Sequence, residues 1–433
     1  MKKTDVMTDV IVIGAGAAGL LAAGRAAAQG AQVLLLEQNK KPGRKIGITG
    51  KGRCNVTNAC DARTFQEHIV TNGRFLFSAL HRLGPAEMMA LLEEAGVPLK
   101  VERGNRVFPV SDRAFDVIDG LVRYAKRNGA RLRTGITVRR IQPAAGGWQV
   151  ITDQEVLTAR AVIAATGGQS YASTGAHGDG YRWAGTLGHT VQPCRPALIP
   201  FTVKEKWAAE MMGLSLKNIA IRIEVGGKKV CEEFGEMLFT HFGVSGPVIL
   251  SASSYLQRYL REQGRSFAEA APVLHLDLKP ALSPEELDER LVRELEAAPA
   301  KNYRNLLAAL LPQKMIGVMV KLTGIPGDKK AADIRREERL RLREQLKNMT
   351  MTLSGTRPAD EAVITMGGVA VNEVDPKTME SRLCPGLFWA GEVLDVDALT
   401  GGFNLQIAFS TGYAAGEGAA AYAEQIKQEE AME

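Results

Sequence analysis

The fold is decided by the stretch Val10-Ile11-Val12-Ile13-Gly14-Ala15-Gly16-Ala17-Ala18-Gly19. Four residues that favour β-strands run directly into a Gly-x-Gly-x-x-Gly pattern, and residues 20–29 then have the alanine-rich composition of a helix. A second apolar run at 33–36 follows and ends at Glu37. This order predicts a βαβ unit whose glycine turn binds the pyrophosphate of a dinucleotide.

Each glycine of the turn has its own expected task. Gly14 permits the tight turn, and Gly19 lets the helix pack closely on the strand. Gly16 lets the backbone approach a pyrophosphate, whose charge would be met by the free N–H groups and the dipole of the helix start. Glu37 is placed to accept hydrogen bonds from ribose hydroxyls, and its charge would repel a 2′-phosphate.

Length and composition exclude several classes of protein. A chain of 433 residues is long enough for two or three domains, and 45% hydrophobic with 24% charged residues is typical of a globular protein. No apolar run reaches the roughly 18 residues of a membrane span, so we expect a cytoplasmic protein without a membrane partner. The five cysteines are scattered and form no C-x-x-C, which indicates neither a disulfide framework nor a metal site. The net charge of +6 permits contact with nucleic acid without requiring it.

The segment 38–58 is rich in glycine, cations and amides. One interpretation is a flexible surface loop. The other is a loop that wraps an anionic cofactor and lines its reactive ring, because it directly follows the ribose-binding acid and long loops of this kind tend to be functional. Cys54 within it is interpreted as a small packing residue rather than a reactive thiol.

A second buried strand is predicted at 161–164, where the chain continues as Ala165-Thr166-Gly167-Gly168. In a nucleotide-binding fold such a strand returns beside the first one, and its glycine pair lets the backbone pass close to the dinucleotide. A glycine-rich loop at 173–180 then enters a helix. A basic run is interpreted as a solvated face rather than a nucleic-acid groove; it consists of Arg123, Lys126, Arg127, Arg131, Arg133, Arg139 and Arg140.

Changes of pattern predict one nucleotide-binding domain, formed by 1–195 and 351–433, that is interrupted by an inserted domain at 196–350. Prolines mark the first boundary, and period-two alternation with the Gly226-Gly227 turn predicts an antiparallel sheet or small barrel over 196–280. Helices are predicted over 281–350. A short strand ending at Gly391-Glu392 precedes a helix whose start, near 401–406, is a second anion-binding helix N-terminus.

Several motifs together resemble the HI0933-like (YhiN/BaiN-like) FAD-dependent oxidoreductases over nearly the whole chain. The most specific are Lys45-x-x-x-Thr49-Gly50-Lys51-Gly52-Arg53-Cys54-Asn55-x-Thr57-Asn58 and Leu238-Phe239-Thr240-His241-x-Gly243-x-Ser245-Gly246-Pro247. The segments 174–180, 366–368 and 390–392 are more distantly similar to fumarate reductase and aspartate oxidase flavoproteins. The resemblance implies an α/β fold: a Rossmann-like FAD-binding domain of the glutathione-reductase type, with an inserted barrel-like and helical domain that caps the flavin.

The resemblance also implies roles for particular residues around an FAD. The turn should contact the pyrophosphate through Gly14, Ala15, Gly16, Ala17, Ala18 and Gly19. Glu37 and Gln38 should lie at the adenosine ribose, and Glu392 near the ribityl or pyrophosphate. The loop should follow the ribityl and isoalloxazine through Lys45, Thr49, Gly50, Gly52, Arg53, Cys54 and Asn55. Amides at Asn404, Leu405 and Gln406 should meet the flavin pyrimidine edge, where negative charge grows on reduction. The other expected cofactor contacts are Thr166, Gly167, Gly168, Asp179, Gly391, Asp397, Gly401, Gly402 and Phe403.

The expected reaction is hydride transfer between the flavin N5 and a small organic substrate with an enone-type double bond. NAD(P)H is expected as a transient electron donor, because only one complete Gly-x-Gly-x-x-Gly unit is visible. His241 is the candidate acid or base and His177 a weaker one, although each is interpreted equally well as a histidine without a catalytic role.

Three other functions stay open from the sequence. An amine or amino-ketone oxidase would release hydrogen peroxide. A tRNA-modifying flavoprotein would have nucleic acid as a partner. A flavin-binding protein without turnover would hold FAD that no electron donor reduces. No metal is expected, and the oligomeric state is left open.

Overall fold

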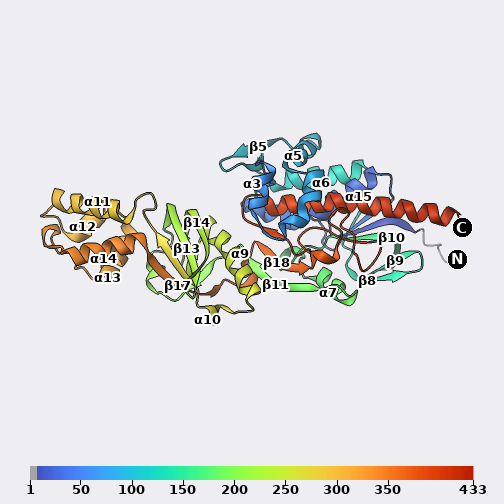
Figure 1. Ribbon diagram of the computed structural model, residues 1–433. Coiled ribbons are helices and arrows are strands. Elements are labelled where there is room, and N and C mark those ends of the chain that lie inside the picture. The colour runs from blue at the N-terminus through green and yellow to red at the C-terminus, as the bar shows by residue number, and fades with distance from the viewer. Residues whose placement is uncertain (1–6, 433) are drawn as a thin grey trace. The chain divides into compact units, whose positions relative to one another are not determined.

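A computed structural model describes residues 7–432 as two compact units (Figure 1). The first consists of the residues up to Pro196 together with those from Asp360 onward, and the second is Ala197–Ala359. Each unit has its own hydrophobic core. None of the helices in this part of the chain is both long and apolar enough to cross a membrane.

The first unit is built on a seven-stranded sheet centred on β1 (Thr8–Ile13). Parallel neighbours lie on both sides of β1, with Ile11 opposite Leu34 of β2 and Val162 of β10. The sheet order is β7-β2-β1-β10-β9-β8, and β19 pairs in parallel with the end of β10. The bounds are β2 (Val33–Glu37), β7 (Arg131–Thr134), β8 (Val138–Ala144), β9 (Gly147–Thr152), β10 (Val156–Ala164) and β19 (Leu387–Trp389). The apolar runs are thus strands covered on both faces, which confirms the predicted Rossmann-like domain.

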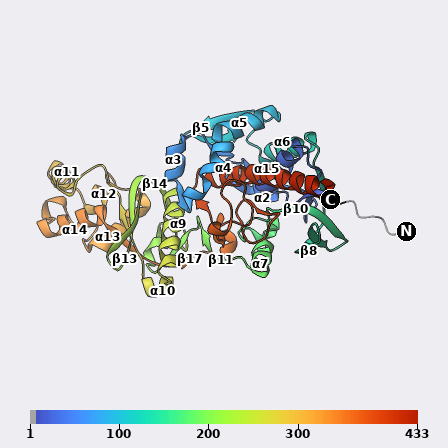
Figure 2. The same cartoon turned by 45° about the vertical axis from the view of Figure 1, so that its right-hand side comes forward.

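The helix α1 (Ala17–Ala28) packs against the carboxy-terminal helix α15 (Phe403–Met432), the red helix of Figures 1 and 2. The contact is very close, because a Cβ placed on Gly412 would lie 2.2 Å from the carbonyl oxygen of Ala18, and one on Gly416 would lie 2.5 Å from that of Ala22. The helix α6 (Ala114–Arg127) also contacts α1. Residues from both ends of the described chain therefore share one core.

Smaller elements complete the first unit. The loop after Glu37 contains the short helix α2 (Arg44–Ile48), and β3 (Thr57–Asn58) pairs with β6 (Arg106–Pro109), which pairs with β5 (Leu99–Glu102). The others are α3 (Ala62–Glu67), β4 (Ile69–Thr71), α4 (Phe77–Arg82), α5 (Pro85–Glu94), α7 (Asp179–Thr186), β11 (Val191–Ala197), β18 (Ile364–Val369) and β20 (Asp397–Ala398). Because β11 and β18 pair, the chain leaves and re-enters the first unit along neighbouring strands.

The second unit contains a closed six-stranded barrel, which confirms the barrel-like insertion. Its order is β12-β15-β14-β13-β16-β17, and β13 and β14 form a long hairpin. The strands are β12 (Phe201–Val203), β13 (Ser215–Val225), β14 (Lys228–Phe239), β15 (Gly243–Ser245), β16 (Val273–Asp277) and β17 (Met349–Thr356). The helices are α8 (Trp207–Glu210), α9 (Pro247–Glu262), α10 (Phe267–Ala270), α11 (Pro284–Ala297), α12 (Tyr303–Leu307), α13 (Gln313–Thr323) and α14 (Arg336–Lys347).

The boundary expected at 350 is wrong. The strand β17 belongs to the barrel, where it pairs with both β16 and β12, and the second unit continues to Ala359. The physical reason is closure: without a sixth strand, β12 and β16 would each keep an unpaired edge. The alternation of buried Met349, Met351 and Leu353 with less buried neighbours carries the period-two pattern of such a strand.

Candidate functional site

The glycine turn lies between β1 and α1, as expected, and its three glycines meet different surroundings. A Cβ on Gly14 (φ +98°) would lie 2.4 Å from the carbonyl oxygen of Ala165, and one on Gly19 would lie 1.7 Å from that of Gly14. At Gly16, in contrast, no described atom lies within 4 Å of an added Cβ. Packing therefore requires Gly14 and Gly19, whereas Gly16 borders open space at the start of the helix.

The start of α1 offers unused backbone donors to that space. Gly16 is the N-cap residue and supplies no side-chain acceptor, and the first intrahelical bond runs from Leu20 N to Gly16 O (3.0 Å). The amides of Ala17 and Ala18 precede that bond and have no partner within the helix. Together with the helix dipole they form an anion-binding site of the kind that holds phosphate groups.

Glu37 fastens the turn to the strand beside it. Its buried carboxylate accepts hydrogen bonds from Ala15 N (2.9 Å) and from both Asn39 N (2.8 Å) and Asn39 Nδ2 (2.7 Å). Asn39 Nδ2 and Gln38 Nε2 in turn donate to the carbonyls of the 174–175 turn. The structure therefore brings the ribose-side candidates together with the glycine-rich segment that leads to Asp179, whose own carboxylate pairs with Arg182 (2.8 Å).

A half-buried polar cluster joins segments that lie far apart in the sequence. Lys45 Nζ forms an ion pair with Glu392 Oε2 (2.6 Å) and donates to Ser170 Oγ (2.7 Å). Glu392 Oε1 accepts from Thr365 N (2.8 Å), and Thr365 Oγ1 accepts from Ser170 N (3.1 Å). The loop, the glycine pair after β10, the start of β18 and the Gly391-Glu392 turn thus meet at one point.

Ser170 and Thr365 are not among the residues that the sequence predicted for this site. Each lies within two residues of a glycine pair that did attract attention, Gly167-Gly168 and Gly367-Gly368. That proximity was the one signal from which they could have been found.

The loop from Thr49 to Asn55 is tightly folded rather than flexible. Gly50, Lys51 and Cys54 all have left-handed backbone conformations, and Cys54 N donates to Thr49 O (3.0 Å). The Cys54 side chain is fully buried, and this burial raises the pKa of its thiol to about 12. The thiol is therefore protonated near neutral pH, as suits a packing residue.

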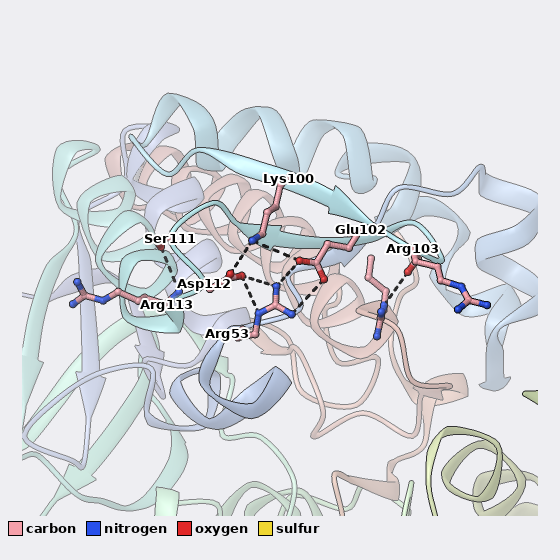
Figure 3. A network of polar contacts seen from close by, with 8 residues as sticks. Arg53, Lys100, Glu102, Arg103, Ser111, Asp112 and Arg113 are labelled. Atoms are coloured by element: carbon pink, nitrogen blue, oxygen red, sulfur yellow. Dashed lines mark hydrogen bonds and ion pairs between the residues drawn. The ribbon is translucent and has the colours of Figure 1, made fainter. Parts of the chain in front are cut away.

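Arg53 is directed toward a neighbouring hairpin. Its guanidinium pairs with Glu102 and Asp112 (Figure 3). It also lies 4.2 Å from the centroid of the Phe108 ring. These two carboxylates raise the pKa of Arg53 above its usual value. An approach of Arg53 to the cofactor consequently depends on its backbone, because the side chain is engaged elsewhere.

Glycines allow the segments that lead into α15 to lie close to the backbone of Thr57 and to the side chain of Ala18. A Cβ on Gly402 would lie 2.4 Å from the backbone of Thr57, and one on Gly391 would lie 2.9 Å from Ala18 Cβ. Asn58 Nδ2 donates to Gly401 O (3.1 Å). The carboxy-terminal candidates therefore lie beside both the loop and the first helix, together with buried Phe403 and Asp397.

The side-chain amides of Asn404 and Gln406 face inward. Asn404 bonds the backbone of Ala398 (2.9 Å and 2.7 Å), and Gln406 Nε2 donates to Leu83 O (2.9 Å). The first intrahelical bond of α15 runs from Gln406 N to Gly402 O (3.1 Å). The backbone amides that precede Gln406 in this first turn therefore have no partner within the helix and could bind a ligand.

Four buried polar atoms in these segments have no hydrogen-bond partner among the described residues. They are Asn55 Oδ1, Thr57 Oγ1, Thr166 Oγ1 and Gln406 Oε1. Buried polar groups in native proteins are almost always satisfied, so such a set indicates a polar ligand. The residues present therefore fit a dinucleotide such as FAD.

The two candidate histidines lie outside the Lys45–Glu392 cluster. His177 is exposed in the turn before α7. His241 is exposed between β14 and β15 of the second unit, with its ring 5.0 Å from that of Phe242. A catalytic role for either histidine stays a prediction.

The motifs gathered at this site are matched by a family model for the HI0933-like protein Rossmann domain, which covers residues 8–418. The chain belongs to the HI0933-like family. A 3-dehydro-bile acid delta(4,6)-reductase of Clostridium scindens is 32% identical over 96% of this chain and 99% of that protein. A ribosomal RNA dihydrouridine synthase of Escherichia coli is 31% identical over 94% of this chain and 96% of that protein. Among solved structures, Escherichia coli quinol fumarate reductase has 17% identity and a TM-score of 0.49, covering 98% of this chain and 73% of that one.

These family relationships support a flavin-type oxidoreductase.

Proposed function

We propose that this protein binds FAD in its first unit and reduces a carbon–carbon double bond that is conjugated to a carbonyl group. The observation that carries the proposal is a set of buried polar atoms from three chain segments that have no hydrogen-bond partner among the described residues, together with the open space beside Gly16. Protein packing alone does not account for buried polar groups that stay unsatisfied.

In this proposal the amides of Ala17 and Ala18 hold the pyrophosphate, and Glu37 accepts from the adenosine ribose. The bound flavin would supply the hydride. The backbone amides at the start of α15 would stabilise the negative charge of the reduced pyrimidine edge, because they are preorganised donors at a helix N-terminus. Lys45 holds Glu392 in place through their ion pair.

The substrate class follows from chemistry shared by the relatives' names. A delta(4,6)-reductase acting on a 3-dehydro-bile acid reduces double bonds in conjugation with a 3-keto group. Dihydrouridine is uridine whose 5,6 double bond, conjugated to the C4 carbonyl, has been reduced. Hydride addition to the far end of a conjugated carbonyl describes both, and we assign this reaction class to the present chain. NAD(P)H is the proposed electron donor.

Anaerobic flavin spectroscopy tests the proposal. FAD-loaded protein should be bleached by NADH or NADPH, and the reduced flavin should then be reoxidised by a 4-en-3-one steroid or another enone. Bleaching by an amine, followed by hydrogen peroxide release in air, would instead identify an oxidase. A flavin that no donor reduces would indicate a binding protein without turnover.

A further inference from the structure

The ring of His68 lies against the start of α15. It stacks on the ring of Phe403, the first residue of that helix, with the ring centroids 4.4 Å apart and the two planes 14° from parallel. Phe65 contacts the same Phe403 ring edge-on, at 5.0 Å between centroids. The imidazole is therefore held against a buried aromatic pair at the helix start.

One ring nitrogen of His68 is used inside the protein. Nδ1 lies 2.7 Å from the carbonyl oxygen of Thr64 in the preceding helix α3. A carbonyl oxygen can only accept, so Nδ1 carries a hydrogen and donates it. Nε2 has no hydrogen-bond partner among the residues that the structure describes. Nε2 can therefore gain and lose a proton while the bond at Nδ1 keeps the ring in place.

The backbone at His68 is fixed to the segment that enters α15. His68 O accepts from Leu399 N (2.9 Å), and the neighbouring strand β4 pairs with β20. Further along the same segment, Gly402 lies against the backbone of Thr57, whose hydroxyl is one of the orphaned buried atoms. His68 is thus joined to the segments that carry the unsatisfied polar groups.

The other five histidines lack this combination of features. His68 is half-buried, so solvent can return a proton to its ring. His189 is buried, and both of its ring nitrogens are engaged. His81 and His177 are exposed, and the remaining two histidines belong to the second unit.

We propose that His68 lines the flavin site and is the proton donor of the reduction, an inference that rests on the proposed function. Reduction of an enone adds a hydride to the carbon far from the carbonyl group, and the electron pair of the double bond moves toward the carbonyl oxygen. The carbon beside the carbonyl must then take a proton, which comes from Nε2–H of the protonated imidazole. The N–H electron pair stays on Nε2, and solvent restores the proton.

A histidine suits this step because imidazole ordinarily changes its charge between pH 5 and 8. The polar side chains of the neighbouring cluster are poorer donors. The ammonium of Lys45 already donates to Glu392 and Ser170. The hydroxyl of Tyr181 donates to Glu392 O (3.2 Å), and burial raises the pKa of Tyr181 well above its ordinary value.

Chemical labelling tests the position of His68 without turnover. Full-length protein with and without FAD is treated with diethyl pyrocarbonate, which modifies accessible imidazole nitrogens, and the modified histidines are identified by mass spectrometry. FAD should slow the modification of His68, whereas exposed His81, on α4 of the same unit, should react at an unchanged rate. Equal rates at His68 with and without FAD would overturn its placement at the site.

Anaerobic stopped-flow kinetics test the proton step. The His68→Phe variant keeps a ring to stack on Phe403 but has no proton to give, so its FAD content and melting temperature should stay near those of the wild type. Reoxidation of its reduced flavin by 2-cyclohexenone should be slowed at least ~100-fold, as expected for loss of a general acid, while reduction by NADPH is unchanged. The matched control His81→Phe should match the wild type in both half-reactions.

Rescue separates a proton donor from a packing residue. Added imidazole should restore part of the reoxidation rate of His68→Ala, because it enters the vacated space and supplies the missing proton, and it should not accelerate His68→Phe. A His68→Phe protein that is reoxidised at the wild-type rate, or a His68→Ala protein that imidazole does not rescue, would overturn the inference. Wild-type protein that 2-cyclohexenone and other enones fail to reoxidise would refute the proposed function and the proton step with it, whereas the labelling would still decide whether His68 lines the site.

Discussion

Gly16 is the residue at which ligand binding and folding separate most clearly. Gly14 and Gly19 are required for packing, because an added Cβ would lie 2.4 Å and 1.7 Å, respectively, from a backbone oxygen. A Cβ added at Gly16 would have no described atom within 4 Å. The Gly16→Val variant should therefore fold with a near wild-type melting temperature but lose FAD, because its side chain fills the position of the pyrophosphate.

The control for that prediction is Gly185→Val, since Gly185 also has open space around it and lies in α7 of the same unit. Flavin absorbance after purification and a melting curve would be measured for both. A Gly16→Val protein that stays yellow would contradict the placement of the pyrophosphate.

His189 shows what sequence alone could not reveal. Its buried ring accepts from Trp389 Nε1 (3.3 Å) at Nε2, contacts Ser381 Oγ (2.7 Å) at the same atom, and reaches Glu373 Oε2 (3.1 Å) through Nδ1. Burial is the largest influence on this group, and it lowers the pKa of His189 below its ordinary 6.5. The three partners come from residues about 190 positions away, so no local pattern indicates the contact.

The lowered pKa predicts a pH dependence of stability. Below about pH 6.5 the unfolded histidine takes up a proton that the native one resists, so the free energy of unfolding falls as the pH drops through this range. The His189→Gln variant should lose about 1–3 kcal/mol at pH 8, because its partners are left without the ring. Urea denaturation at several pH values should show that deficit shrinking toward pH 5; a deficit that grows on acidification would contradict the assignment.

At the scale of elements, strands were predicted well and their ends less well. The apolar runs at 10–13, 33–36 and 161–164 became β1, β2 and β10, because strands buried on both faces need continuous hydrophobicity. The end of the barrel was missed at β17, which pairs with strands up to about 150 residues earlier in the chain. A strand whose partners are so distant carries only its own alternation as a signal.

The contact between α1 and α15 provides a stability test. Glycine-to-alanine changes inside helices ordinarily stabilise, so Gly317→Ala in α13, with no described atom within 4 Å, should gain about 0.5–1 kcal/mol. Gly412→Ala should instead lose about 1–3 kcal/mol, because its Cβ would meet Ala18 O at 2.2 Å. Chemical denaturation of both variants measures the difference; a stabilised Gly412→Ala protein would show that the two helices pack less closely.

At the scale of the whole molecule, the first unit is expected to bind FAD without the second. It has its own core and sheet, and the strands β11 and β18 that lead out of and back into it are paired. Replacing 198–359 with a short glycine–serine linker should leave FAD affinity within about tenfold of the full-length value, or 1.4 kcal/mol. Isothermal titration would decide it, and loss of all binding would show that the barrel supplies essential contacts.

Sequence predicted the class of fold, because the strand–turn–helix signal of the dinucleotide unit is local. It also identified segments that meet at the candidate site, through their glycines. It could not show that Arg53 turns toward a hairpin or that the side chains of Asn404 and Gln406 face inward, since these depend on contacts with Glu102, Ala398 and Leu83.

Titration of deflavinated full-length protein with FAD measures cofactor binding by the first unit. We expect saturable uptake of one FAD per chain, with a shifted visible flavin spectrum, and no uptake by the Gly16→Val variant. Wild-type protein whose added FAD keeps the spectrum of the free cofactor at every concentration would contradict this expectation.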